Sequence, residues 1–244
     1  MVDKITVRGM VLSQSPMGEY DKRIVLLTDT AGRISAFARG ARRQGSGFMG
    51  KTEVFSFGTF TLYPGRNSYT LTGAEVENYF TGIREDLELS VYGMYFLEFA
   101  SYYAREGQDE TETLKLLYAS LLALQKRKMA PALIRRAYEL KLMTVNGEAP
   151  DVTACARCGN DAGNMYLSFK DRGVLCADCR TEGDLRLSGS ALYAMRYIAS
   201  QPVERLFRFT VSDEVQEQLD RVMDGYISRY TDRKLNSARM IDML

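Results

Sequence analysis

All four cysteines of this 244-residue chain lie in two C-x-x-C pairs, and no other feature restricts the fold as strongly. Residues 159–175 separate the pair Cys155/Cys158 from the pair Cys176/Cys179. Two disulfides would suit a short secreted scaffold, whereas this chain is long and clusters its thiols. A redox-active C-x-x-C normally begins a helix in a βαβ pattern, which surrounds neither pair. The spacing instead is typical of zinc ribbons, in which each pair forms a tight turn.

We therefore predict one zinc ion per chain, held by the thiolates of Cys155, Cys158, Cys176 and Cys179. Four protein ligands complete a tetrahedron and leave no position for an activated water, so the expected role is structural. Gly159 follows the first pair, and Gly173 is expected in the turn between strand-like segments at 165–169 and 174–176. Catalytic or redox use of the cysteines remains the alternative.

Residues 1–80 have the pattern of β-structure. They contain five runs rich in Val, Ile, Thr, Phe and Tyr, at 4–14, 22–29, 33–40, 54–64 and 68–80. Stretches with good turn chemistry, such as "SPMGEYD" and "PGRN", divide these runs. Five short strands in so few residues suggest a small closed barrel, and the OB-fold is the five-stranded member of that class. An SH3-like barrel is the structural alternative.

Beyond residue 80 the hydrophobic period becomes helical. Helices are expected within 85–106, 110–128, 130–147, 188–202 and 212–230. The residues at the helix ends agree with these ranges: Pro131 is near a first turn, Gly147 follows a last turn, and Ser212 is a suitable N-cap. The aromatic run at 92–103 is expected to be core rather than a binding surface.

These patterns together predict an α+β multidomain protein. An N-terminal OB-fold barrel is followed by an all-helical domain into which the four-cysteine zinc ribbon is inserted. The expected ranges are 1–80 for the barrel, 81–150 and 188–244 for the two parts of the helical domain, and 151–187 for the ribbon.

Composition excludes several classes of function. The chain has no histidine, which removes Ser-His-Asp and Cys-His catalysis and imidazole metal ligands. Its net charge of +1 provides no global field that selects nucleic acid or membrane. The N-terminus has no long apolar region and no later stretch reaches about 18 apolar residues, so a cytoplasmic protein without membrane contact is expected.

Local charge is informative where global charge is not. Residues 33–51 contain five basic residues and no acidic one, and they run from a predicted strand into a Gly- and Ser-rich loop. A loop of this kind could bind phosphates with an affinity that depends on salt and is largely blind to sequence. Aromatic residues of the strands could stack on bases, although about half of them should face the core: Phe37, Phe60, Tyr63 and Tyr69. A solvated loop without function is the alternative.

An enzyme is the less favoured class. No G-x-x-x-x-G-K-[ST] phosphate loop occurs, so ATP hydrolysis is not expected. A carboxylate pair for acid–base chemistry would have to use Glu75 and Glu77, which are expected merely to flank the last strand.

A second alternative is an RNA-binding zinc-ribbon protein of translation or ribosome assembly, which would use the same basic barrel.

The chain resembles the RecO family of bacterial recombination mediators. The segment "GMVLSQSPMGEYDKRIVLLTDTAGRISAFARGARR" at 9–43 is similar to the opening of that family, with its "GE-D" turn and "ARGARR" exit. The segment "YELKLMTVNGEAPDVTACARCG" at 138–159 resembles the family's helix running into the ribbon. The similarity covers essentially the whole chain. Some family members lack the cysteines, whereas this chain has all four.

The resemblance implies a non-enzymatic protein of DNA repair and recombination that binds single- and double-stranded DNA and anneals complementary strands. It further implies a complex with RecR and help in loading RecA onto DNA coated by single-strand-binding protein (SSB), in the cytoplasm at the nucleoid. The family's DNA-binding surface falls here on Arg39, Arg42, Arg43 and Lys51, with Lys22 and Arg23 on the adjacent strand.

The resemblance also implies contact with the acidic C-terminal tail of SSB. A peptide of that kind needs an apolar pocket with cations at its rim, because its aromatic ring must be desolvated and its carboxylates must be paired. Apolar helix faces lie beside Arg135 and Arg136, which are preferred because Arg can hold a carboxylate through two hydrogen bonds. The further candidates are Lys126, Arg127 and Lys128, and the alternatives are Arg229 and Arg233.

Overall fold

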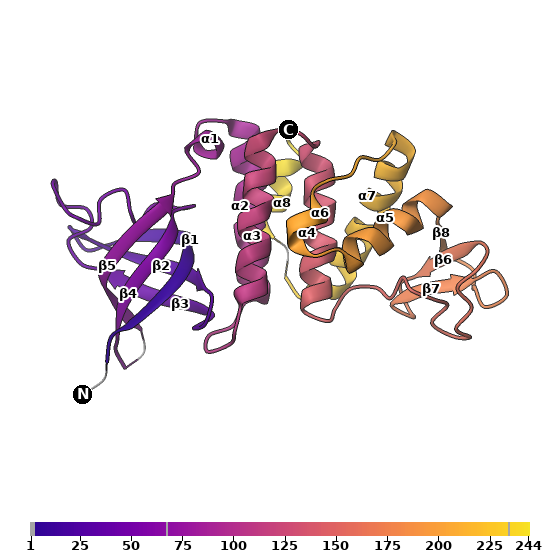
Figure 1. Ribbon diagram of the computed structural model, residues 1–244, viewed down its shortest axis with the longest axis horizontal. Coiled ribbons are helices and arrows are strands. Elements are labelled where there is room, and N and C mark those ends of the chain that lie inside the picture. Colours follow the sequence, from indigo (N-terminus) through magenta and orange to yellow (C-terminus); the bar gives the residue numbers. More distant parts are fainter. Residues whose placement is uncertain (1–2, 67, 234) are drawn as a thin grey trace. The chain divides into compact units, whose positions relative to one another are not determined.

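The computed structural model of the chain describes residues 3–66, 68–233 and 235–244 (Figure 1). The chain divides into two compact units, Met1–Gln125 and Lys126–Leu244. The first unit contains a closed barrel and two long helices, and the second contains the remaining helices and the cysteine ribbon. This division is based on compactness and does not test the domain ranges expected from the sequence, which remain predictions.

Five strands close the barrel in the order β1-β2-β3-β5-β4. Their bounds are β1 (Ile5–Met17), β2 (Asp21–Thr28), β3 (Arg33–Ala38), β4 (Phe57–Pro64) and β5 (Tyr69–Asn78). Neighbouring strands are antiparallel except β3 and β5, which run parallel where Ala36 pairs with Tyr69. This is the expected OB-fold barrel.

The barrel has one continuous apolar interior because its strands alternate faces. Along β3 every second residue is buried, from Ile34 to Ala38. Fully buried side chains of this core include Ile24, Leu26, Ile34 and Phe60. Burying a side chain of this size stabilises the fold by about 2 kcal/mol.

Two glycines allow the barrel to close tightly. Gly9 on β1 and Gly58 on β4 are direct cross-strand partners. A Cβ atom at Gly58 would lie 2.0 Å from the carbonyl oxygen of Glu75, and one at Gly9 would lie 2.7 Å from that of Leu27. Any larger residue would therefore force neighbouring strands apart.

The first unit continues with α1 (Thr81–Arg84), α2 (Leu87–Tyr103) and α3 (Thr111–Lys126). The aromatic run on α2 is core, as expected: the rings of Tyr95 and Phe99 stack 5.8 Å apart and both are buried. Tyr118 of α3 places its ring 4.4 Å from that of Phe57 at the start of β4. An aromatic pair thus joins α3 to the barrel.

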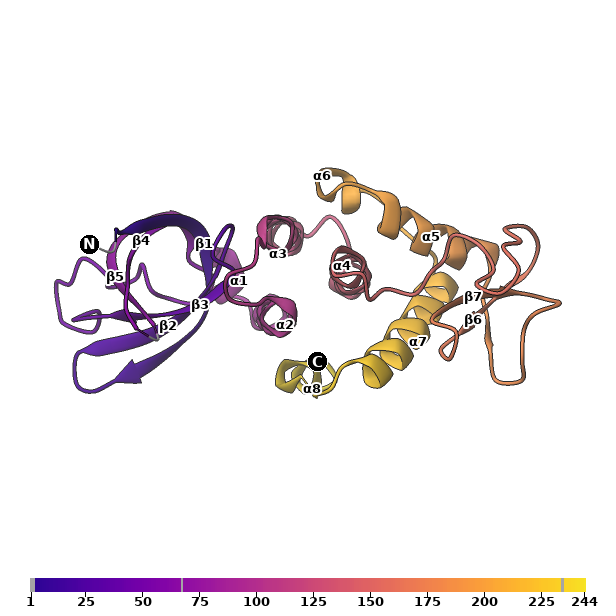
Figure 2. The same ribbon diagram turned by 90° about the horizontal axis from the view of Figure 1, so that it is seen from below.

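Three helices of the second unit pack on one another: α4 (Pro131–Val145), α5 (Gly189–Ser200) and α7 (Asp213–Tyr230) (Figure 2). Two short helices, α6 (Val203–Leu206) and α8 (Asn236–Ile241), were not expected because so few residues carry no readable period. Pro131 begins α4, and Ser212 is the N-cap residue of α7. Its side chain makes no hydrogen bond that caps the helix; instead its hydrogen bond to the side chain of Glu214 helps to lower the pKa of that carboxyl.

The ribbon lies between α4 and α5 in sequence and forms a three-stranded sheet in the order β7-β6-β8. The strands are β6 (Met165–Ser168), β7 (Gly173–Cys176) and β8 (Leu185–Arg186). Arg196 of α5 donates hydrogen bonds of 2.7 Å to the carbonyl oxygens of Val152 and Thr153, which fixes the ribbon to the helices. Among the described residues, no helix is both long and apolar enough to cross a bilayer.

Candidate metal centre and candidate nucleic-acid interface

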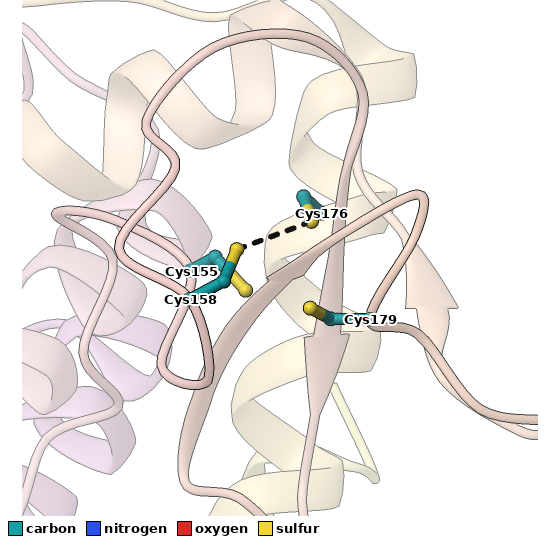
Figure 3. Close-up of side chains that lie close together, drawn as sticks. All are labelled: Cys155, Cys158, Cys176 and Cys179. Carbon is teal, nitrogen blue, oxygen red and sulfur yellow. Dashed lines mark hydrogen bonds between the residues drawn. The ribbon is translucent and has the colours of Figure 1, made fainter.

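The four cysteine side chains converge from two loops at one end of the ribbon (Figure 3). Their sulfur atoms all lie within 4.8 Å of one another, and those of Cys158 and Cys176 are 3.6 Å apart. Sulfurs bound to one tetrahedral zinc at about 2.3 Å would be roughly 3.8 Å apart. The donor set therefore fits a single metal ion with four thiolate ligands. The predicted ligand residues are brought together as expected.

Backbone hydrogen bonds shape the two metal-binding turns alike. The Cys155 carbonyl accepts from the N–H of Gly159 at 2.8 Å, and the Cys176 carbonyl accepts from the N–H of Arg180 at 3.0 Å. Gly159 has φ 77°, a left-handed conformation that favours glycine.

The expectation that Gly173 supplies the turn between β6 and β7 is wrong. The left-handed residue there is Arg172, with φ 52°, whereas Gly173 begins β7. Gly173 is needed for a different reason: a Cβ atom on it would lie 2.9 Å from the carbonyl oxygen of Asp151. The sequence pattern does not reveal this close approach by a distant segment.

The thiols of the cluster differ in acidity. Burial opposes ionisation of Cys155, but N–H groups of the backbone around Cys176, Cys158 and Arg157 outweigh it and bring the pKa of Cys155 to about 6. Hydrogen bonds with the thiols of Cys158 and Cys176 raise the pKa of Cys179 to about 12. Four thiolates this close need a cation to neutralise them, which a divalent metal ion supplies.

The basic loop between β3 and β4 winds through consecutive tight turns over residues 39–56. The side chains of Arg39, Arg42 and Arg43 are exposed on it. Lys51 is half-buried and donates a 3.0 Å hydrogen bond to the carbonyl of Ala74 on β5. The three arginines thus face solvent, whereas Lys51 holds the loop against the barrel.

A surface hollow of about 280 Å³ lies where this loop meets the β1–β2 hairpin, lined by Gln14, Ser15, Pro16, Lys22 and Arg42. The guanidinium of Arg42 donates to the carbonyl of Gly18 at 3.2 Å, and that of Arg43 lies 4.9 Å from the ring centre of Tyr20. These contacts orient two cations toward the hairpin without neutralising them.

The two strand cations expected beside the loop are already engaged. Lys22 forms a 2.6 Å ion pair with Glu53, and Arg23 donates to the hydroxyl of Ser35 at 2.7 Å. Burial acts to raise the pKa of Glu53, but hydrogen bonds from Lys22 and Gln14 outweigh it and lower this pKa. Lys22 therefore contributes less net positive charge than the loop arginines do.

The candidate stacking residues divide between core and surface, as the alternation of strand faces predicts. Phe60 is fully buried in the barrel, whereas Tyr63 is 45% exposed. Phe37 and Tyr69 are half-buried. The carboxylates of Glu75 and Glu77 lie exposed on β5, and Glu77 pairs with Arg8 at 2.5 Å.

The candidate residues for peptide binding occupy two different environments. Lys126, Arg127 and Lys128 are exposed. The guanidinium of Arg136 is almost fully buried between carboxylates: Asp220 at 2.6 Å, Asp224 at 2.8 Å and Glu139 at 2.9 Å. Arg135 contacts Glu139 at 2.8 Å, and the side chain of Glu139 has 0% exposure.

Arg135 and Arg136 therefore join α4 to α7 within the fold. Burial acts to lower the pKa of Arg136, but the three carboxylates raise it well above its ordinary value. A peptide carboxylate would have to displace partners that are already in place.

Sequence reasoning missed a hollow of about 540 Å³ in the second unit. It lies between the first turns of α5 and the extended segment 208–212, and its apolar walls are Tyr193, Ala194, Tyr197, Phe209 and Val215. Tyr193 is 72% exposed, and the cation Arg208 also lines the hollow. The hollow is formed by two separate segments, α5 and residues 208–212, and neither segment contains a recognisable motif by itself.

Comparison with known proteins decides the family. The family model for "Recombination protein O N terminal" matches residues 1–80, and the model for "Recombination protein O C terminal" matches residues 84–239. The chain belongs to the RecO family. The resemblance stated from the sequence is therefore confirmed, and the chain is a member of a DNA repair family.

Individual RecO proteins are similar over nearly their full length. DNA repair protein RecO of Symbiobacterium thermophilum is 34% identical, covering 98% of this chain and 96% of the relative. That of Acetivibrio thermocellus is 32% identical, covering 97% and 96%, and that of Alkaliphilus metalliredigens is 31% identical, covering 94% of each.

Proposed function

We propose that this RecO-family protein binds DNA through the rim of its N-terminal barrel, and that it acts without catalysing a reaction. The observation that carries the proposal is the exposure of Arg39, Arg42 and Arg43 beside a hollow that also contains Lys22. Exposed guanidiniums without a carboxylate partner bind phosphate oxygens through paired hydrogen bonds. Binding of this kind suits any sequence of bases.

Single-stranded DNA receives additional contacts at this rim. Tyr63 presents an exposed ring and Phe37 a half-exposed one, and either can stack on an unpaired base. Lys51 and Arg23 support the loop and the adjacent strand in this proposal, with smaller direct contributions. Annealing then follows from phosphate neutralisation, because two strands that each carry fewer uncompensated charges repel one another less.

Zinc is the metal that the cysteine cluster holds in this proposal. Four sulfur ligands in a tetrahedral arrangement favour zinc over harder ions, and a closed set of protein ligands makes the ion structural. When bound, it joins the two turns of the ribbon; the protein supplies the four thiolates. The position of the ribbon between α4 and α5 makes metal loss a matter of stability for the second unit.

The partners that we propose are RecR, SSB and, indirectly, RecA, with the protein acting at the nucleoid in the cytoplasm. For the acidic tail of SSB, the hollow beside α5 supports a different location from the one expected at Arg135 and Arg136. It offers aromatic walls and the exposed cation Arg208, whereas Arg136 is buried among its own carboxylates.

The peptide location is tested with variants that preserve the fold. Arg208→Glu should weaken binding of a fluorescent acidic peptide that ends in phenylalanine and a free carboxylate, whereas Lys128→Glu should leave it unchanged. If Lys128→Glu weakens binding and Arg208→Glu does not, the peptide binds near the start of α4 instead.

The test of the proposed function is DNA binding by the purified protein as a function of salt. Affinity for single-stranded DNA should fall steeply with salt, and affinity should vary little between oligonucleotides of different sequence. Competition with structured RNA distinguishes the alternative function in translation or ribosome assembly. Preference for the RNA over single-stranded DNA at equal salt would contradict the proposal.

A further inference from the structure

The tip of the ribbon hairpin and the last turns of α7 form a second cluster of cations, distant in sequence from the barrel. The cluster consists of Lys170, Arg172 and Arg229, together with the rings of Phe169 and Tyr230; we call it the hairpin-tip patch. All three cations are exposed. Among the described residues, none of the three forms an ion pair with a carboxylate.

Two of the cations are held in place by aromatic rings. The guanidinium of Arg172 lies 4.3 Å from the ring centre of Tyr230, and that of Arg229 lies 4.2 Å from the ring centre of Phe169. The pairs cross between the elements, because Arg172 and Phe169 belong to the hairpin, and Arg229 and Tyr230 belong to α7. Stacking fixes a guanidinium plane while leaving edge N–H groups available to an anion. In Arg229, Nη1 also donates a 2.7 Å hydrogen bond to the carbonyl of Gly225, and the other edge of the guanidinium remains for the anion.

The backbone under the patch is also fixed. The hydroxyl of Tyr230 donates a hydrogen bond to the carbonyl of Phe169. Gly225 lets the Phe169 ring approach α7, since a Cβ atom there would lie 2.6 Å from Cζ of the ring. The neighbouring carboxylate of Asp171 is paired with Arg157 at 2.9 Å and so compensates little of the patch charge.

From these contacts we propose that the hairpin-tip patch binds the phosphate backbone of duplex DNA. Phosphate fits because three cations without carboxylate partners, two of them planar and pre-oriented, match its oxygens. One arginine lies over each ring. The ring of Tyr226 lies beside both, with its centre 4.5 Å from that of Tyr230 and 6.5 Å from that of Phe169, so the patch leaves little ring surface on which an unpaired base can stack. It therefore does not need exposed bases, and the regular phosphates of a duplex suffice.

This proposal extends the proposed function. It rests on the proposed function because both require that the protein binds DNA. The barrel rim has exposed aromatic residues for unpaired bases, and the hairpin-tip patch has none. One chain would then hold a single strand at the barrel and a duplex at the patch, which are the substrate and the product of annealing.

The test uses the full chain with Lys170→Ala and Arg172→Asn combined. Asn tolerates the left-handed conformation that Arg172 adopts, so the turn is preserved while two charges are removed. The control is Arg186→Gln, which removes one exposed cation on β8 of the same ribbon. Thermal unfolding and metal content verify that both variants fold.

Affinity for a blunt DNA duplex and for single-stranded DNA is measured over a range of salt. The double variant should lose roughly tenfold in duplex affinity near 0.1 M salt, with a salt slope flatter by about 1.8, while single-strand affinity changes little. The control should match the unaltered protein. A loss of duplex affinity no greater than the loss of single-strand affinity would overturn the proposal, and so would unchanged duplex binding.

A failure of the proposed function itself gives a different result. If the unaltered protein binds neither form of DNA with salt-dependent affinity, the barrel proposal fails. If it binds single strands and the double variant behaves like the control on duplex DNA, only the role of the hairpin-tip patch is contradicted.

Discussion

The guanidinium of Arg136 on α4 contacts the carboxylate of Asp220 on α7, with Nε and Oδ1 2.6 Å apart. The two residues are 84 positions apart in the sequence. Arg136 also neutralises Glu139, whose side chain has no exposure to water. A residue that resembles a surface cation in the sequence is therefore part of the joint between two helices.

Replacing Arg136 should test this joint directly. Arg136→Met should lower the free energy of unfolding by about 3 kcal/mol, because Glu139 then loses one of its cations while it remains buried. Chemical denaturation measures the change. Lys128→Met removes an exposed cation nearby and should change the free energy of unfolding by less than about 0.5 kcal/mol. Equal stability of the two variants would exclude a structural role for Arg136.

The metal prediction concerns Cys176, which is buried at the start of the second turn. Freshly purified reduced protein should contain about one zinc ion per chain, and Cys176→Ser should lose it and become sensitive to protease within the ribbon. Arg180→Gln, which removes a neighbouring cation and no sulfur, should retain the metal. Absence of metal from fresh protein, or intact disulfides in a thiol titration, would contradict the assignment.

The packing of the hairpin on α7 depends on a glycine. Gly225→Ala places a methyl group 2.6 Å from Cζ of Phe169, so the hairpin must shift, at a cost of about 1–3 kcal/mol. Gly189→Ala is the matched change, because a Cβ atom there meets nothing within 4 Å and its helix gains the better propensity of alanine. Thermal unfolding should separate the two variants, and a Gly225→Ala protein as stable as Gly189→Ala would show that the contact is unimportant.

Acid should weaken the link between Lys22 and Glu53. Hydrogen bonds lower the pKa of Glu53 below its ordinary value of 4.5, so its contribution is present above that pH and is lost as the pH falls through the folded pKa. Because the carboxylate is about a third exposed, the contribution is under about 1 kcal/mol. Glu53→Gln should reduce the difference in unfolding free energy between pH 7 and pH 3. An identical pH profile would exclude the link.

The sequence could predict the elements that depend on local patterns. Alternating runs predicted five barrel strands, and cysteine spacing predicted the four ligands that lie within 4.8 Å of one another. It could not predict which side chains meet across long separations. The burial of Arg136 depends on α7, and the hollow beside α5 joins its first turns to segment 208–212.

The same limit applies to close backbone approaches. Gly173 looks like a turn residue in the sequence, but its lack of a side chain serves the contact with Asp151. Arg172 takes the left-handed position instead, an uncommon conformation for arginine that its stacking on Tyr230 accompanies. Residue type alone does not show that Arg172 takes the turn conformation and that Gly173 serves the close contact.

The most direct test of DNA binding at the barrel rim compares two triple variants with the same net charge. One replaces Arg39, Arg42 and Arg43 with alanine, and the other replaces Lys126, Arg127 and Lys128. The first should weaken single-strand binding about equally for all sequences and flatten the salt slope by about two to three units, whereas the second should bind like the unaltered protein. Unchanged affinity and slope in a folded Arg39/Arg42/Arg43 variant would contradict the assignment of DNA binding to the barrel.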